Sequence, residues 1–254
     1  MPSLETRNLT IRFGGHVAVN AVTCAFEPGT LTAIVGPNGA GKTTYFNLIS
    51  GQLKATEGEV RLHGRDISKL SAPMRTLAGI GRAFQLTSLF PNLSVMENVR
   101  LALQSRQRLG LDLWNVWNHY RALIERADEV LASVALGSRR DVRAAELSHG
   151  DQRKLEVGLL IALDPDIYMF DEPTAGMSVD EVPVILDLIR ALKSRRDRTI
   201  LLVEHKMDVV RELADRIIVL HNGSLMADGD PEAVIASPVV QQAYLGLAVL
   251  DEAA

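Results

Sequence analysis

Cysteine is nearly absent from this sequence of 254 residues, and no apolar run is long. The single Cys24 excludes an internal disulfide and is compatible with a reducing compartment. Apolar runs such as residues 157–163 fall far short of the ~20 residues that cross a bilayer. Residues 1–5 lack the charged start of a signal peptide, so none is expected. The formal net charge of -4 argues against nucleic acid as the main partner, because phosphate backbones select basic surfaces.

Hydrophobic residues make up 47% of the chain and charged residues 23%, which is typical of a globular protein with a sizeable core. Strand-like and helix-like runs alternate, and this order predicts a largely parallel α/β sheet. Strands are expected at residues 4–13, 17–26, 31–35, 59–62, 80–84, 167–170, 200–203 and 217–220, and helices at 42–50, 184–192 and 207–214. From about 94 to 160, apolar residues recur at helical spacing among charges, which predicts an inserted helical subdomain.

A glycine-rich segment follows the apolar run at residues 31–35. It matches the phosphate-loop pattern G-x-x-x-x-G-K-[ST] in full, with Gly36, Pro37, Asn38, Gly39, Ala40, Gly41, Lys42 and Thr43. Glycines let backbone N–H groups surround phosphate oxygens, and the helix that follows adds its positive end. Lys42 is suited to neutralise the terminal phosphates, and Thr43 to coordinate magnesium. We therefore predict an ATP and Mg²⁺ site, with Thr44 also at the nucleotide.

A second apolar strand, residues 167–170, ends in the two acids Asp171 and Glu172. Taken alone, such acids could be solvated residues at the start of a loop. Beside a phosphate loop, Asp171 is placed to hold magnesium and Glu172 to polarise an attacking water. A water-polarising acid favours hydrolysis over phosphoryl transfer to a second substrate.

With five further motif residues, these segments resemble the ABC ATPase family over nearly the whole chain. The resemblance implies that Phe13 stacks on adenine. It also implies that Gln85 contacts the nucleotide and its metal ion and links the site to the helical subdomain. Ser148 and Gly150 match the phosphate-facing pair of the family signature L-S-G-G-Q, and His205 matches the histidine that senses the γ-phosphate.

The resemblance implies one ABC ATPase domain over residues 1–254, with the helical subdomain at about 94–160. Its expected fold is an α/β P-loop NTPase core with a mainly parallel sheet, an N-terminal antiparallel β region and the inserted helices. Lys42, Glu172 and His205 are the expected catalytic residues, and Thr43, Asp171 and Gln85 the expected magnesium ligands. A structural homologue that does not hydrolyse ATP is the alternative, and the intact catalytic residues argue against it.

Three positions depart from the family pattern. His149 and Asp151 replace a glycine and a glutamine in the signature, and Ser178 replaces an acid in the loop after Glu172. These positions bear on communication between the two ATP sites that the resemblance implies. The remaining histidines match no motif and are interpreted as structural: His16, His63, His119 and His221.

Residues 79–85, 106–119 and 175–177 resemble the ATP-binding subunits of branched-chain amino-acid importers. Importers of urea, short amides or other small solutes are alternatives, as is a soluble ABC ATPase that is not part of a transporter. The family resemblance implies a two-fold dimer with itself or with a homologous subunit, bound to integral membrane permease subunits at the cytoplasmic face of the inner membrane. A solute-binding protein outside the membrane would be an indirect partner, and no nucleic-acid partner is expected.

Overall fold

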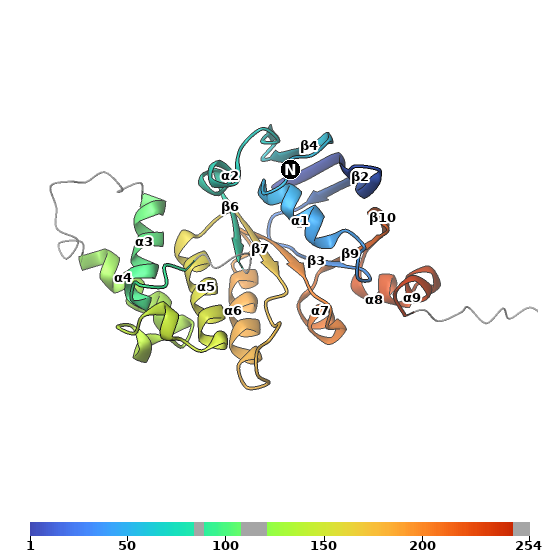
Figure 1. Cartoon of the computed structure of the whole chain (residues 1–254). Helices are drawn as coiled ribbons and strands as arrows, with labels where there is room; N and C mark the ends of the chain where they lie inside the picture. The colour runs from blue at the N-terminus through green and yellow to red at the C-terminus, as the bar shows by residue number, and fades with distance from the viewer. Residues whose placement is uncertain (84–88, 108–120, 246–254) are drawn as a thin grey trace, which may run out of the picture.

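Two β-sheets and the helices around them form the structure, a computed structural model that describes residues 1–83, 89–107 and 121–245 (Figure 1). The first sheet has four antiparallel strands in the order β2-β1-β4-β5. Its strands are β1 (Leu4–Phe13), β2 (His16–Phe26), β4 (Glu57–Leu62) and β5 (Arg65–Asp66). Strands β1 and β2 form a hairpin, with Leu4 opposite Phe26 and Phe13 opposite His16.

The second sheet has six strands in the order β10-β9-β3-β8-β7-β6. They are β3 (Leu31–Val35), β6 (Ile80–Ala83), β7 (Ile167–Asp171), β8 (Thr199–Val203), β9 (Arg216–His221) and β10 (Ser224–Gly229). All neighbours pair in parallel except β9 and β10. Every residue of β3 and β8 is buried, because a parallel sheet is covered on both faces and its central strands are continuously apolar. The predicted α/β fold with an N-terminal antiparallel region is confirmed.

Helix α1 (Lys42–Ser50) lies between the two sheets (Figure 1). Its Tyr45 and Phe46 belong to one hydrophobic cluster with Phe26 of the first sheet and Ile34 and Met169 of the second. This packing fixes the N-terminal end of α1, which carries the phosphate loop. The opposite face of the second sheet is covered by α6 (Val182–Ser194) and, beside it, α7 (Met207–Leu213).

Helices α3 (Val95–Gln107), α4 (Arg121–Ser133) and α5 (His149–Leu163) are grouped at one side of the sheets. We call these three helices the helical region. Leu131 of α4 and Leu155 of α5 share a cluster with Phe170 of β7 and Ile189 of α6, so the helical region packs on the sheet through a common apolar core. No helix in the described segments is long and apolar enough to cross a membrane.

Several short elements have no counterpart among the predicted strands and helices. They are β5, β10, α2 (Ala72–Ala78), α8 (Pro231–Ala236), α9 (Pro238–Leu245) and two single turns of 3-10 helix, Gly137–Arg139 and Ala144–Glu146. Each is too short for its apolar residues to set a clear period. Their positions depend on packing against longer elements rather than on local pattern.

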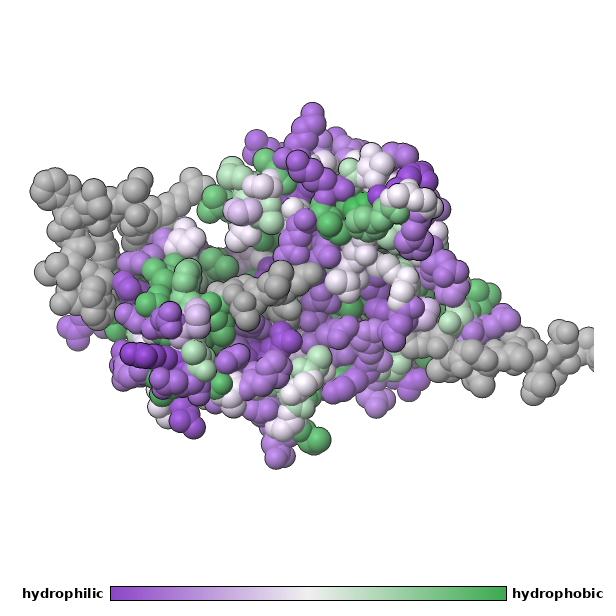
Figure 2. Space-filling view, in the orientation of Figure 1, coloured by the Kyte–Doolittle hydropathy of each residue, from purple (hydrophilic) through white to green (hydrophobic). Residues whose placement is uncertain are grey.

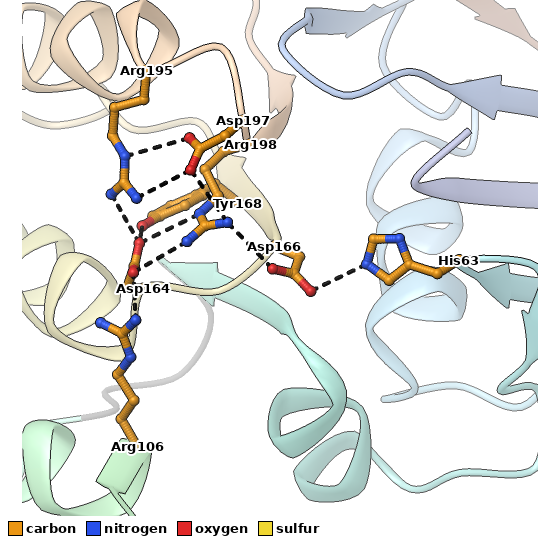
Figure 3. Close-up of polar contacts among 8 residues, drawn as sticks. All are labelled: His63, Arg106, Asp164, Asp166, Tyr168, Arg195, Asp197 and Arg198. Carbon is orange, nitrogen blue, oxygen red and sulfur yellow. Dashed lines mark hydrogen bonds and ion pairs between the residues drawn. The ribbon is translucent and has the colours of Figure 1, made fainter. Parts of the chain in front are cut away.

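Asp164 joins the helical region to the sheet (Figure 3). It ends α5 in a left-handed conformation, with φ of 42°. Its carboxylate accepts hydrogen bonds from Arg106 of α3 at 2.6 Å and from Tyr168 of β7 at 3.0 Å. The guanidinium groups of Arg195 and Arg198 also reach it, at 2.9 and 3.2 Å. Burial alone would raise the pKa of Asp164, but the hydrogen bonds from Arg198, Tyr168 and Arg195 outweigh it and lower the pKa to about 2.

Replacing Asp164 by asparagine should destabilise the fold. Asparagine keeps the shape and tolerates a left-handed backbone, but it removes the charge that the arginines face. Because the folded-state pKa of about 2 lies below the ordinary 3.8, the charge stabilises the fold fully above about pH 4 and less as the pH falls toward 2. Urea unfolding should show a loss of about 1–3 kcal/mol at pH 7 that shrinks below pH 4.

Asp141→Asn is the matched control, because the Asp141 side chain is 89% exposed and its ion pair with Arg140 measures 3.8 Å. Its stability should stay close to that of the wild type at every pH. A loss in Asp164→Asn that did not change with pH would show that the carboxylate charge is not what holds this junction.

Candidate nucleotide-binding site

The carboxyl ends of three neighbouring strands bring the predicted site together. The phosphate loop follows β3, Glu172 follows β7 and His205 follows β8, and these strands are adjacent in the order β3-β8-β7. A pocket of about 420 Å³ opens at this edge. It is lined by Phe13, His16, Ala18, Asn38, Gly39, Ala40, Gly41, Lys42, Thr43, Thr44, Glu172 and His205. Ligands of α/β sheets bind at the carboxyl ends of the strands, so the pocket has the position expected of a nucleotide site.

The phosphate loop needs its glycines for two reasons. Gly36 and Gly41 have φ of 151° and 95°, which side chains rarely allow. A Cβ at Gly36 would lie 2.2 Å from the Leu220 carbonyl oxygen, and one at Gly41 would lie 2.5 Å from that of Ala18. The loop can therefore curl tightly against its neighbours only with glycine at these two positions.

Lys42 begins α1 and lies along the phosphate loop. Its Nζ donates hydrogen bonds to the Gly36 and Pro37 carbonyl oxygens at 2.7 and 3.0 Å. Burial lowers the pKa of Lys42, and the charges of Glu172 and Asp171 act in the opposite direction. The ammonium group is thus fixed at the mouth of the loop, between backbone carbonyls and two acids.

Glu172 and His205 form an exposed pair across two loops. His205 Nε2 lies 2.7 Å from Glu172 Oε1, with the two side chains 39% and 40% exposed. Glu172 has φ of 51°, a left-handed conformation that costs energy in a residue other than glycine. Its backbone N–H donates to the Val203 carbonyl oxygen at 2.9 Å, which holds this conformation against β8.

Asp171 has a buried cationic partner that the sequence did not reveal. Arg82 Nη2 lies 2.6 Å from Asp171 Oδ2, and the two side chains are 6% and 10% exposed. The same guanidinium donates to Asn47 Oδ1 at 2.7 Å and lies over the Phe46 ring, 5.4 Å from its centroid. Arg82 therefore connects the acid at the end of β7 to helix α1.

The donors at this edge fit a magnesium ion that is bound together with phosphates. Mg²⁺ prefers oxygen ligands, usually one or two side chains plus phosphate oxygens and waters. The Asp171 carboxylate and the Thr43 hydroxyl are such donors. Among the described residues, no group of three or more His, Cys, Asp or Glu side chains could hold a metal ion.

Not every predicted site residue lines the pocket. Gly36, Pro37 and Asp171 lie within two residues of lining residues in the sequence but are not in the lining themselves. Ser148 and Gly150 lie at the start of α5 and do not line the pocket. Gln85 lies outside the described residues. His16, interpreted as structural from the sequence, lines the pocket beside Phe13. No motif signals His16, but its place opposite Phe13 in the β1–β2 hairpin could have indicated it.

Known proteins match this chain from end to end. A family model described as ABC transporter covers residues 19–175. The chain belongs to the ABC transporter family. It is an ATP-binding cassette ATPase, as the motifs predicted.

Two curated relatives of this cassette ATPase are transport proteins. LivG of Escherichia coli (strain K12), a high-affinity branched-chain amino acid transport ATP-binding protein, is 36% identical over 96% of this chain and 98% of its own. BraF of Pseudomonas aeruginosa, described in the same words, is 37% identical over 96% of this chain and 98% of its own.

Two solved structures show the same fold in different states. A nucleotide-free ATP-binding cassette from an ABC transporter is 29% identical, with a TM-score of 0.82 over 97% of this chain and all of the other. A dimeric cassette in a post-hydrolysis state, bound to ADP and Pi, is 27% identical, with a TM-score of 0.77 over 90% of this chain and 98% of the other.

Phe13→Ala should weaken nucleotide binding without disturbing the catalytic residues. Phe13 is 50% exposed and lines the pocket, and stacking contributes about 0.5–1.5 kcal/mol beyond burial. Titration with a fluorescent ATP analogue should show an affinity roughly twofold to tenfold lower. Phe90→Ala is the matched control, because Phe90 is 55% exposed and lies outside this pocket. Equal affinity in both variants would place the base elsewhere.

Proposed function

We propose that this cassette ATPase energises an importer of branched-chain amino acids at the cytoplasmic face of the inner membrane. The observation that carries the proposal is the identity of 36–37% to LivG and BraF over nearly the full length of all three chains. Each alignment covers 96% of this chain, so it includes the helical region as well as the ATP-binding motifs.

We assign the residues of the pocket to the steps of ATP hydrolysis. Lys42 would neutralise the terminal phosphates, and Phe13 would stack on the base. Glu172 would accept a proton from the attacking water, since it is the exposed carboxylate at the end of β7. His205 contacts Glu172, so it is placed to orient this carboxylate and to sense the γ-phosphate. Magnesium, held by Thr43, Asp171 and Gln85, would offset the phosphate charge.

A complete site would need a second subunit. Ser148 caps α5, and its oxygen accepts a hydrogen bond from the Asp151 backbone N–H at 3.1 Å. This leaves the hydroxyl proton free to be donated to an anion, at a helix end that itself favours negative charge. Because Ser148 and Gly150 lie away from the pocket of their own chain, we propose that each phosphate loop faces the partner subunit's Ser148 and Gly150. The dimeric cassette of the same fold supports a two-subunit assembly.

Two of the residues that depart from the family pattern have local partners. Asp151 pairs with Lys154 at 2.9 Å, within the first turn of α5, where an acid is favourable. Ser178 donates from its backbone N–H and its hydroxyl to Glu181 Oε2, at 3.2 and 2.9 Å. These contacts stabilise the ends of α5 and α6 and give each substituted residue a structural role.

We propose that permease subunits dock in a groove beside the helical region. The groove has a volume of about 490 Å³ and lies between the helical region and the end of β6. Its apolar lining includes Phe90, Leu101, Ala102, Leu159, Leu160 and Leu163. Hydrophobic residues are exposed around α3 and α5 on the face that Figure 2 shows, and such patches mark protein contacts. Glu156 and Arg82 also line the groove, and Glu156 is paired with Arg153 at 3.2 Å, so an apolar segment would fit it.

Reconstitution with the permease subunits and solute-binding protein of a branched-chain amino-acid importer tests the proposal. Uptake of labelled leucine, isoleucine or valine by proteoliposomes should require ATP and this chain, and the chain should be recovered with membranes only when the permease is present. Uptake of urea or a short amide instead would support an importer and contradict the proposed substrate. Membrane recovery without the permease, or no stimulation of any uptake, would contradict the importer itself.

Glu172→Gln should bind ATP, hydrolyse it very slowly and accumulate as a closed dimer. Glutamine keeps the size of the side chain but cannot accept a proton from water, while Lys42, Thr43 and Asp171 still bind phosphate and magnesium. Sizing with ATP and Mg²⁺ should give a dimer, and sizing with ADP a monomer.

The exposed surface residue Glu232 of α8 provides a control. Glu232→Gln should hydrolyse ATP at the wild-type rate and should not be trapped as a dimer. If Glu172→Gln turned over like the wild type, or stayed monomeric with ATP, the assignment of Glu172 as the residue that accepts the proton would be wrong.

A further inference from the structure

A buried contact joins the same two loops that carry the exposed pair Glu172 and His205. Thr174 follows Glu172 in the loop after β7, and Glu204 precedes His205 directly after β8. Thr174 Oγ1 donates a hydrogen bond of 2.5 Å to Glu204 Oε1. Thr174 is 1% exposed and Glu204 is 3% exposed, whereas the catalytic pair is about two-fifths exposed. The loops are therefore joined twice, once in solvent and once in the interior.

Glu204 also fixes the backbone on which His205 stands. Its Oε2 accepts hydrogen bonds from the His205 backbone N–H at 2.7 Å and from the Lys206 backbone N–H at 3.3 Å. In the described part of the chain, the donors seen at Glu204 are thus one hydroxyl and two amide groups, all uncharged. A buried carboxylate is costly unless it is hydrogen-bonded, and only an acceptor with two oxygens satisfies three donors of this kind. The Glu204 carboxylate is thus the shared acceptor of these three hydrogen bonds, one from the other loop and two from its own.

The other end of the contact supports Glu172. Glu172 holds a left-handed backbone, with φ of 51°, and such a conformation persists only where the surroundings fix it. The Ala175 backbone N–H donates to the Glu172 carbonyl oxygen at 3.1 Å, which makes residues 172–175 a tight turn. Thr174 lies inside this turn, so its bond to Glu204 fastens the turn to β8.

We propose that Thr174 and Glu204 are positioning residues, which set the distance between Glu172 and His205 without touching the nucleotide. This inference rests on the proposed catalytic roles of Glu172 and His205. The loop after β7 carries the proposed proton acceptor and the loop after β8 carries its partner. Strand pairing aligns β7 and β8 up to Asp171 and Val203. Beyond it, the described contacts between the two loops are the Glu172 backbone hydrogen bond to Val203, the exposed pair and this buried bond. Small displacements of reacting groups lower turnover strongly.

Thr174→Val removes the hydroxyl and keeps the shape, which makes it the central variant. Its kcat for ATP should fall between about tenfold and a hundredfold, while KM and nucleotide affinity stay within about twofold, since Phe13 and the phosphate loop are untouched. Thr174→Ser restores the hydroxyl, and its kcat should return to within about threefold of the wild type. The rescue by serine separates hydrogen bonding from packing.

Glu204→Gln tests the same bond from its other end. Glutamine offers one acceptor oxygen where the carboxylate offers two, so kcat should again fall by about tenfold or more with little change in KM. Because both residues act through one contact, the double variant Thr174→Val/Glu204→Gln should be no slower than the slower single variant, within about threefold. Fully multiplied losses would contradict a shared contact.

Thr32→Val is the matched control, since Thr32 is also buried and its hydroxyl has no hydrogen-bond partner in the described part of the structure. Its kcat should remain within about twofold of the wild type, and Tm is measured for every variant.

Wild-type kcat in Thr174→Val and Glu204→Gln, or a loss in Thr174→Ser equal to that in Thr174→Val, would overturn the inference. Glu172→Gln is measured alongside these variants. Wild-type turnover in Glu172→Gln would remove the proposed catalytic pair itself. An inactive Glu172→Gln together with a fully active Thr174→Val would contradict the positioning role and leave the catalytic role of Glu172 in place.

Discussion

Strand β8 lies between β3 and β7 and pairs in parallel with both. The candidate site depends on this arrangement, because parallel strands place their carboxyl ends at one edge. Residues that lie up to 169 positions apart in the sequence, such as Gly36 and His205, meet there. The continuous apolar runs of β3 and β8 stabilise the sheet, and the loops that follow these strands carry the polar groups. A change in strand order would leave each motif intact and remove the pocket.

The acids Asp171 and Glu172 at this edge have cationic neighbours both in the pocket and in the protein interior. Lys42 faces the acids from the phosphate loop, and Arg82 pairs with Asp171 from the interior. Burial lowers the pKa of Arg82, and its hydrogen bond to Asp171 acts in the opposite direction. A fixed cation there keeps Asp171 oriented toward helix α1, whose first residues are Lys42 and Thr43. The arrangement places one acid, Glu172, alone at the pocket surface.

The sequence predicted the parts of the site that follow a local pattern. Three motifs can each be recognised from a segment of about ten residues. They are the phosphate loop, the acids after β7 and the segment in which His205 matches the family. Arg82, Thr174 and Glu204 could not be found in this way, because their partners become neighbours only through the order of the strands. From the sequence alone, each of the three could equally be interpreted as a polar residue exposed to solvent. The same limit applies to α2, α8 and α9, whose apolar residues are too few to define a helix without their packing partners.

Helix α5 connects two features that lie outside the pocket, Ser148 and Asp164. It has 15 residues, which gives it a length of about 22 Å. Ser148 caps its first turn, and Asp164 ends it with contacts to α3 and to the sheet. Asp164 therefore holds one end of α5 against Tyr168 of β7, four residues before the proposed proton acceptor Glu172. A rotation of the helical region about this anchored end would move Ser148 the farthest. A small change at Tyr168, near the start of β7, and a larger change at Ser148 would then occur at the two ends of one rigid helix.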